Sequence, residues 1–147
     1  MVAVSLKNLK SGVVISEIPE MAISAPPKPR ILAIGPEARG AAASQAGEVV
    51  NPFAHPRTMA SDFTVAEHML KHYLRRALGH SLLKLAPAVV IHPLGAPAGG
   101  FTQVERRAFR EMALGAGASR VMVWTGRALT DHEAMTWRFR PGEGEAD

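Results

Sequence analysis

A capped amphipathic helix that leads directly into a short apolar run constrains this chain more than any other feature. Residues 102–124 read TQVERRAFREMALGAGASRVMVW. Thr102 followed three residues later by Glu105 is the pattern of a capping box, in which each side chain accepts a hydrogen bond from the backbone amide of the other. The apolar positions recur at a spacing of three to four, at Val104, Ala108, Phe109 and Met112. This spacing predicts a helix from about Gln103 with one face in the core.

The segment after this helix predicts a stop and then a strand. Gly115 and Gly117 allow backbone conformations that end a helix, and residues 121–124 form a short apolar run of strand-forming residues. The whole segment is therefore expected to be a helix leading into a buried strand.

A second helix is predicted over residues 62–79, where Asp62 or Thr64 supplies the cap and Gly79 ends the helix. Its apolar stripe consists of Val65, Met69, Leu70, Tyr73, Leu74, Ala77 and Leu78. The other faces carry His68, Lys71, His72, Arg75 and Arg76. We interpret these basic faces as a solvated surface, because such residues are rarely fully buried.

The remaining pattern predicts several strands and one short helix. Apolar runs at 13–15 and 21–23 flank a turn-like Ile-Pro-Glu and predict an antiparallel hairpin, and residues 88–91 predict a strand covered on both faces. Residues 30–34 predict another strand, 36–43 a short helix, and 47–57 an irregular segment. This order indicates an α/β domain with one mixed sheet and flanking helices. The strands near Val13, Met21, Ile31, Val89 and Val121 are expected to form that sheet.

Composition narrows the class of protein. The chain has 147 residues, 47% of them hydrophobic, which suits one domain over residues 1–140 followed by an acidic flexible tail, 141–147. It contains no cysteine, so disulfides and thiolate metal sites are excluded. No apolar run approaches the roughly 20 residues that cross a bilayer, and the first residues lack the order of a secretory signal, so a cytoplasmic protein is expected.

The charge of the chain is basic, with a formal net charge of +4 although three of its acids lie in residues 141–147. A basic surface attracts nucleic acid or anionic lipid. Here the basic residues are scattered, aromatic residues make up 5% of the chain, and no basic–aromatic motif is present. We therefore expect no nucleic-acid binding, whereas peripheral membrane contact stays open.

Candidate chemical groups are few. His92 follows a predicted central strand, where open α/β sheets place ligands, but no carboxylate or second histidine stands at a recognisable spacing from it. The loop 95–100 lacks the lysine and the glycine spacing of nucleotide-binding loops. Asp131, His132 and Glu133 are adjacent, so they point in different directions and predict a solvated turn. We therefore name no catalytic, cofactor-binding or metal-binding residue.

The opening segment resembles the signature of MreB, the bacterial actin family that helps determine rod shape. The family places Val-Glu-Arg-Arg-Ala before an Ala-Gly-Ala turn and an apolar strand, as residues 104–108, 116–118 and 121–124 do here. SDFTVAEHMLKHYLRRA resembles its Ala-Asp-Phe-x-Val segment and the helix after it. GVVISEIPEMAI resembles its early hairpin, and Gly35, Ala38 and Arg39 keep its Val-Gly-x-x-Ala-Lys pattern. The resemblance covers residues 3–133 and implies the first large domain of the actin-like ATPase, or ribonuclease H-like, fold.

The departures from the family pattern bear on activity. The family's first strand, with its phosphate-binding loop Asp-Leu-Gly-Thr-Ala-Asn, is missing from this sequence, as are the second phosphate loop, the adenosine pocket and the second large domain. Thr125 and Gly126 stand where the family has two acids after the apolar strand. The resemblance therefore implies a truncated, non-catalytic member without the ATP and magnesium site, and with a sheet edge left unpaired.

Three interpretations of function stay open. The first is a module that acts by protein contact with a full-length bacterial actin or with itself. Its expected contact residues are the arginines of the two helices, Arg75, Arg76, Arg106, Arg107 and Arg110. The second is a nucleotide-dependent filament protein, or a small-molecule enzyme that uses new groups such as His92 and Asp131. The third is a decaying paralogue without a function.

Overall fold

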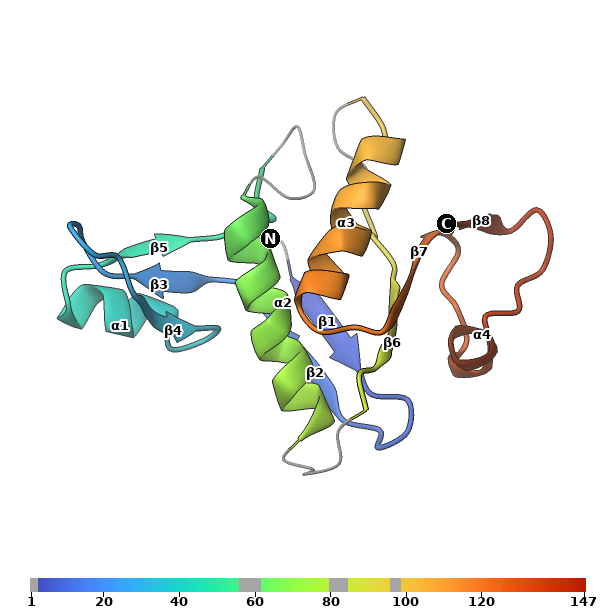
Figure 1. The fold of residues 1–147 in the computed structure, drawn as a ribbon, viewed down its shortest axis with the longest axis horizontal. Coiled ribbons are helices and arrows are strands. Elements are labelled where there is room, and N and C mark those ends of the chain that lie inside the picture. The colour runs from blue at the N-terminus through green and yellow to red at the C-terminus, as the bar shows by residue number, and fades with distance from the viewer. Residues whose placement is uncertain (1–2, 56–61, 80–84, 96–98) are drawn as a thin grey trace.

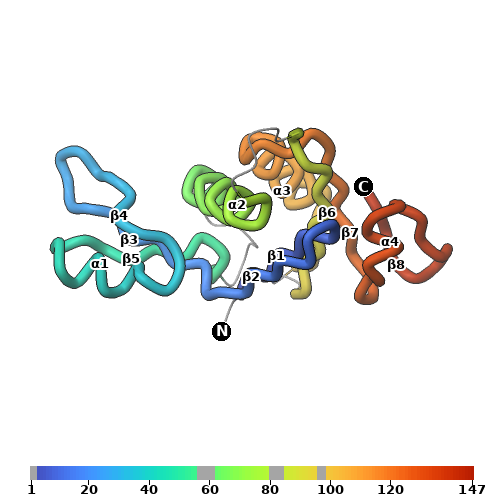
Figure 2. The backbone as a smooth tube through the Cα atoms, turned by 90° about the horizontal axis from the view of Figure 1, so that it is seen from below, coloured from blue at the N-terminus to red at the C-terminus, as the bar shows by residue number. Residues whose placement is uncertain are grey.

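The structure is a computed structural model that describes residues 3–55, 62–79, 85–95 and 99–147. Its elements, in chain order, are β1 (Val4–Lys7), β2 (Val14–Glu17), β3 (Met21–Ile23), β4 (Ile31–Ile34), α1 (Ala38–Ser44), β5 (Glu48–Val50), α2 (Phe63–Leu78), β6 (Ala88–Ile91), α3 (Gln103–Gly115), β7 (Arg120–Gly126), α4 (Asp131–Thr136) and β8 (Gly144–Ala146). Helices α2 and α3 lie side by side as one layer, and β1, β2, β6 and β7 lie beneath them (Figures 1 and 2). Strands β3, β4 and β5 form a separate group with α1 on one side of α2 (Figure 1).

The two long helices have the predicted ends. The Thr102 hydroxyl accepts a hydrogen bond from the Glu105 amide, and the Glu105 carboxylate accepts one from the Thr102 amide, which confirms the capping box of α3. In α2 the Asp62 carboxylate accepts from the Val65 amide at 3.1 Å, so Asp62 rather than Thr64 is the cap. Gly79 follows α2 with φ at 71°, a conformation that favours glycine and ends the helix.

The two strands predicted on either side of α3 lie in one sheet, as expected. β6 pairs with β7 in parallel, with Val89 opposite Val121 and Ile91 opposite Val123. α3 connects the two strands and packs on β7. This is the crossover arrangement that a parallel pair requires.

The prediction of one mixed sheet is wrong, because the strands form three sheets with the orders β1-β2, β4-β3-β5 and β6-β7-β8. The predicted hairpin of 13–15 with 21–23 does not form. The turn between β1 and β2 is stabilised more than the turn between 13–15 and 21–23 that the sequence predicts. In it the Asn8 carboxamide oxygen accepts hydrogen bonds from the amides of Lys10 and Ser11. Gly12 in the same turn has φ at 78°. β2 therefore pairs with β1, and β3 pairs with β4 and β5.

Four elements were not predicted, namely β1, β5, α4 and β8. Strands β1 and β5 are short and exist because a neighbouring strand pairs with them. β8 lies in the segment 141–147 that was expected to be a flexible tail, and it pairs with β7 in antiparallel orientation. Tertiary pairing, rather than local propensity, decides such short strands.

Each of the three sheets has open edges, as any unclosed sheet does, so these edges do not test the expected loss of a family strand. Among the residues that the structure describes, β1 bonds only to β2, and β6 bonds only to β7. Figures 1 and 2 both show β1 and β6 next to each other.

Two buried clusters lie beneath the helix layer. The first consists of Ile15, Met21, Met69, Tyr73 and Ala77, and the second of Ala66, Phe109, Met112 and Val123. Val104 does not belong to the core of α3 as predicted, because 78% of its surface is exposed. The buried face of α3 is centred on Phe109 and Met112, and Val104 lies more than a right angle away from that centre around the helix.

Candidate interaction surface

The five predicted contact arginines divide into two groups in the structure. Arg76, Arg106 and Arg110 form ion pairs within the chain. Arg75 on α2 and Arg107 on α3 are exposed, and neither has an ion pair with any described residue. Only the second group presents a free guanidinium to a partner.

Arg106 is a structural residue rather than an outer contact, because only 11% of its side chain is exposed. Its Nη2 donates to the Thr125 hydroxyl at 2.6 Å and to the Glu145 carboxylate at 3.0 Å. The guanidinium also lies 5.4 Å from the Phe101 ring centroid, a cation–π contact. Its Nη1 is buried without a hydrogen-bond partner among the described residues. Arg106 therefore joins α3 to the carboxyl end of β7.

The outward face of α3 combines apolar and charged side chains. Val104, Arg107, Glu111 and Leu114 recur at spacings of three and four, so they form one stripe, which we call the outer α3 stripe. Val104 is 78% exposed and Leu114 is 40% exposed. The two apolar side chains lie about 15 Å apart along the helix axis, with Arg107 and Glu111 between them.

Two bidentate ion pairs hold the segment around residues 17–20 to its neighbours. Arg76 of α2 donates to both oxygens of Glu17 at 2.9 and 2.7 Å. Arg39 of α1 donates to both oxygens of Glu20 at 2.8 and 2.7 Å. The Arg39 guanidinium holds the pKa of Glu20 below its usual value. These contacts give Arg39, which the family resemblance singled out, a structural role.

A small polar cavity of about 280 Å³ adjoins the first of these pairs. Its lining consists of Glu17, Ile34, Pro36, Glu37, His72 and Arg76. Burial lowers the pKa of His72, and the nearby Arg76 lowers it further. Burial also raises the pKa of the adjacent Tyr73 to about 12, and the Tyr73 hydroxyl has no hydrogen-bond partner among the described residues.

His92 and Asp131 have separate structural partners. The His92 Nε2 lies 3.0 Å from the Gly126 carbonyl oxygen. Asp131 accepts from the Lys7 ammonium at 2.7 Å, which ties α4 to the end of β1. Within the described ranges, no group of three or more histidine, aspartate or glutamate side chains could hold a metal ion.

The expected solvated turn at 131–133 is instead the first turn of α4. Thr130 and Glu133 form a second capping box, in which the Thr130 hydroxyl accepts from the Glu133 amide and the Glu133 carboxylate accepts from the Thr130 amide. The prediction overlooked this Thr-x-x-Glu pattern, which is visible in the sequence.

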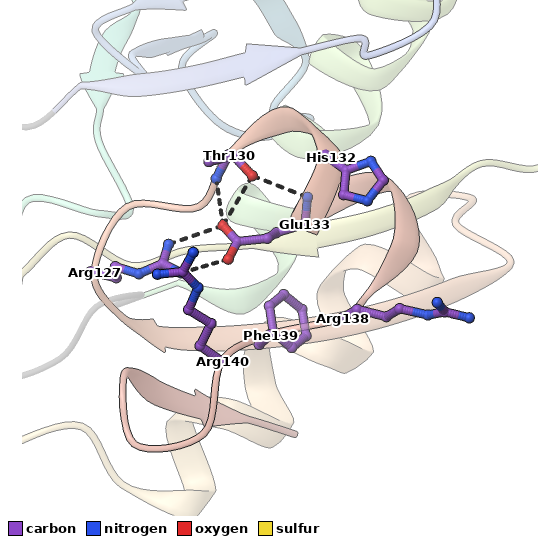
Figure 3. A pocket seen from close by; sticks show the side chains of 7 residues that line it. All are labelled: Arg127, Thr130, His132, Glu133, Arg138, Phe139 and Arg140. Atoms are coloured by element: carbon purple, nitrogen blue, oxygen red, sulfur yellow. Dashed lines mark hydrogen bonds and ion pairs between the residues drawn. The ribbon is translucent and has the colours of Figure 1, made fainter.

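Arg127 links this capping box to the end of the chain. It donates to the carboxylates of Glu133 and Glu143, and Figure 3 shows the first of these contacts. The Arg127 guanidinium and the Thr130 amide hold the pKa of Glu133 down, at about 2, and the two carboxylates raise the pKa of Arg127. The surrounding cavity, of about 520 Å³, is lined by Arg127, Thr130, His132, Glu133, Arg138, Phe139 and Arg140.

Sequence reasoning missed the acidic partners of the arginines. Glu143, Glu145 and Asp147 alternate along the chain, a period that fits a strand with one charged face. Their alternation was a signal for β8.

The loop 95–100 lies partly outside the described residues. No described helix has the length and apolar character needed to cross a membrane.

Known proteins with similar sequences share one family description and one name. A family model described as MreB/Mbl protein matches residues 2–129. The cell shape-determining protein MreB of Escherichia coli (strain K12) is 33% identical over 117 residues, which cover 76% of this chain and 32% of that protein. The protein of the same name from Pasteurella multocida is 41% identical over 61 residues, covering 42% of this chain and 16% of that protein. The chain thus spans about a third of the length of the first relative.

Proposed function

This chain belongs to the MreB/Mbl family, and from this premise we propose that it acts by protein contact in a cell-shape cytoskeleton without hydrolysing ATP. Its relatives carry the name cell shape-determining protein. The observation that carries the proposal is the outer α3 stripe, an exposed mixed face on a helix inside the region that the family model matches.

The stripe offers both affinity and orientation to a partner. Val104 and Leu114 supply apolar area. Burying a fully exposed side chain of this size contributes about 1.5–3 kcal/mol, and the contribution of Leu114 is smaller because only 40% of it is exposed. Arg107 and Glu111, which lie between Val104 and Leu114, carry opposite charges. These charges can select the register in which a partner surface binds. Arg75 on α2 adds an exposed cation on the same helix layer.

The proposal that the chain does not hydrolyse ATP rests on the chemistry of two side-chain positions. Thr125 and Gly126 stand where the family resemblance places acids. The Thr125 hydroxyl accepts from Arg106, and Gly126 has no side chain. A hydroxyl engaged in this way is a poor general base, and neither residue offers a carboxylate to a divalent cation.

Co-sedimentation with filaments of a full-length MreB tests the contact. The wild-type chain is expected in the filament pellet, and the double variant Val104→Glu with Arg107→Glu is expected in the supernatant. Arg138→Glu, the same charge reversal as Arg107→Glu but at an exposed site after α4, is the control and should still pellet. Wild-type chain that stays in the supernatant would contradict the proposed contact with filaments.

Nucleotide titration tests the second half of the proposal. A ligand at 100 times its dissociation constant raises the free energy of unfolding by about 2.7 kcal/mol, so ATP binding would shift thermal unfolding measurably. We expect no shift and no phosphate release. Turnover that is lost in His92→Ala or Asp131→Ala would establish an enzyme instead.

A further inference from the structure

Residues 143–147, which we call the acidic strand segment, are seated along the edge of β7 that faces away from β6. Thr125 lies opposite Glu145 in the antiparallel register. Val123 and Asp147 exchange two backbone hydrogen bonds, of 3.0 and 3.1 Å. The Arg127 amide donates to the Glu143 carbonyl at 3.3 Å. The segment thus pairs with β7 over its whole length.

Each acid of this segment meets one arginine. Glu143 pairs with Arg127, Glu145 with Arg106 at 3.0 Å, and Asp147 with Arg110 at 3.0 Å. Alternate residues of a strand point to one face, so the three carboxylates face the same side. Arg106 and Arg110 are four residues apart on α3 and therefore also share one face. The spacing of the three arginines beside β7 therefore matches the spacing of three alternate acids on a strand.

The opposite face of the segment requires a residue without a side chain. A Cβ atom added at Gly144 would overlap the Trp124 indole and would lie 2.6 Å from the Thr125 carbonyl oxygen. The indole is held in place because it stacks on Phe139 at 4.6 Å and donates to the Arg127 carbonyl at 2.8 Å. The edge therefore accepts an acidic strand with glycine opposite the indole.

The segment is held weakly within one molecule. β8 has only three residues, all of them exposed, and the acids of the segment are partly solvated, with side-chain exposures of 34% for Glu143, 81% for Glu145 and 49% for Asp147. Ion pairs with such exposure contribute little and are screened by salt. The contacts therefore select an acidic strand for the β7 edge but bind it weakly.

We propose that the β7 edge with Arg106, Arg110 and Arg127 is a docking site for the acidic strand segment of a second copy, which displaces the chain's own segment. A second copy fits because it presents the same acids and the same glycine at the same spacing. Exchange of an identical element is a low-cost route to association. The chain's own segment competes at an effective concentration in the millimolar range. A second copy therefore displaces it only where the local concentration of the protein is high. The proposal deepens the proposed function and rests on it only in taking protein contact as the mode of action.

Peptide binding tests the docking chemistry. The acceptor is the full chain with Gly144→Val, whose own segment cannot seat against Trp124, and the probe is a fluorescent peptide of residues 141–147. We expect saturable binding by fluorescence anisotropy, weakened at least about threefold when Arg110→Glu is added. Lys71→Glu, an exposed charge change on α2, should leave the affinity unchanged. Absent binding, or equal binding by the Arg110→Glu acceptor, would overturn the proposal.

A second acceptor, Glu145→Lys with Asp147→Lys, keeps the backbone of the segment and serves if Gly144→Val does not fold. It should bind the peptide with the same dependence on Arg110. Circular dichroism confirms the fold of each acceptor before the titration.

Sedimentation of the wild-type chain tests the identity of the occupant. We expect reversible dimers at concentrations up to about 1 mM, and fewer dimers at high salt or in Gly144→Val. A monomer throughout this range would overturn docking of a second copy. Co-sedimentation with MreB filaments is a separate readout, so its failure with peptide binding intact would reject the proposed function alone.

Discussion

Replacing the buried tyrosine of α2 by phenylalanine is expected to stabilise the protein. Tyr73 is 1% exposed, and its hydroxyl has no hydrogen-bond partner among the described residues. A buried hydroxyl left unpaired costs about 1–3 kcal/mol, whereas Tyr73→Phe keeps the ring that fills the core. We expect the free energy of unfolding to rise by about 1 kcal/mol and the Tm by roughly 2–4 °C for a chain of this length.

The same substitution should remove a dependence of stability on alkaline pH. Burial, aided by the Glu17 carboxylate, raises the pKa of Tyr73 from 10.0 to about 12, so the folded state favours the neutral phenol. The stability that this preference contributes is complete below pH 10 and is lost as the pH rises through about 12. A difference of two pKa units corresponds to a loss of about 2.7 kcal/mol. Tyr73→Phe should lack this part of the alkaline loss.

Urea denaturation at several pH values and tyrosinate absorbance together test this reasoning. Tyr73 is the single tyrosine of the chain, so the absorbance reports its ionisation alone. Met69→Leu, a volume-conserving change in the same cluster, is the control for core substitution and should keep the wild-type alkaline loss. Destabilisation by Tyr73→Phe at neutral pH, or tyrosinate forming in the folded protein near pH 10, would refute the assignment of a buried, unpaired hydroxyl.

Three further predictions follow from caps and titrating groups. Thr102→Ala removes the cap of α3 and should lower the free energy of unfolding, measured in urea, by about 0.5–2 kcal/mol. Thr64 is not the cap of α2, so Thr64→Ala should leave the free energy of unfolding nearly unchanged, and equal losses in the two variants would contradict the cap. The Glu133 carboxyl should titrate by NMR at about pH 2, and the stability that its ionised form contributes above its ordinary pKa of 4.5 should be lost as the pH falls through about 2; a midpoint at 4.5 would contradict the ion pair. His72 should titrate below 6.5, so the stability that its neutral form contributes is lost as the pH falls through the lowered pKa of His72. The Glu17 carboxylate raises the pKa of His72, so Glu17→Gln should lower it further, and an unchanged or raised midpoint would contradict the contact between Glu17 and His72.

The two long helices and the strands on either side of α3 could be predicted because their signals are local. Thr102 and Glu105 are three residues apart, and the apolar stripe that contains Met69 and Tyr73 repeats with the period of a helix. Such patterns need no knowledge of distant residues. The apolar run at 88–91 likewise indicated a buried strand, which the structure pairs with β7.

The candidate surface was less predictable, because exposure depends on where each helix lies. Five arginines were named from their places on two helices, and three of them are tied to acids at least 37 residues away in sequence. No local pattern reports a partner at that separation. Arg75 and Arg107 stay available because no described acid reaches them.

The sequence by itself determined the elements whose stability comes from their own residues, namely the capped helices α2 and α3, and it carried the family resemblance in the motifs around them. Only the tertiary structure decided which strands pair, because strands as short as β1 and β8 gain their backbone hydrogen bonds from a neighbour that the local sequence does not specify. It also decided that residues 143–147 are a strand, since their three acids meet Arg127, Arg106 and Arg110 only when α3 and β7 are in place.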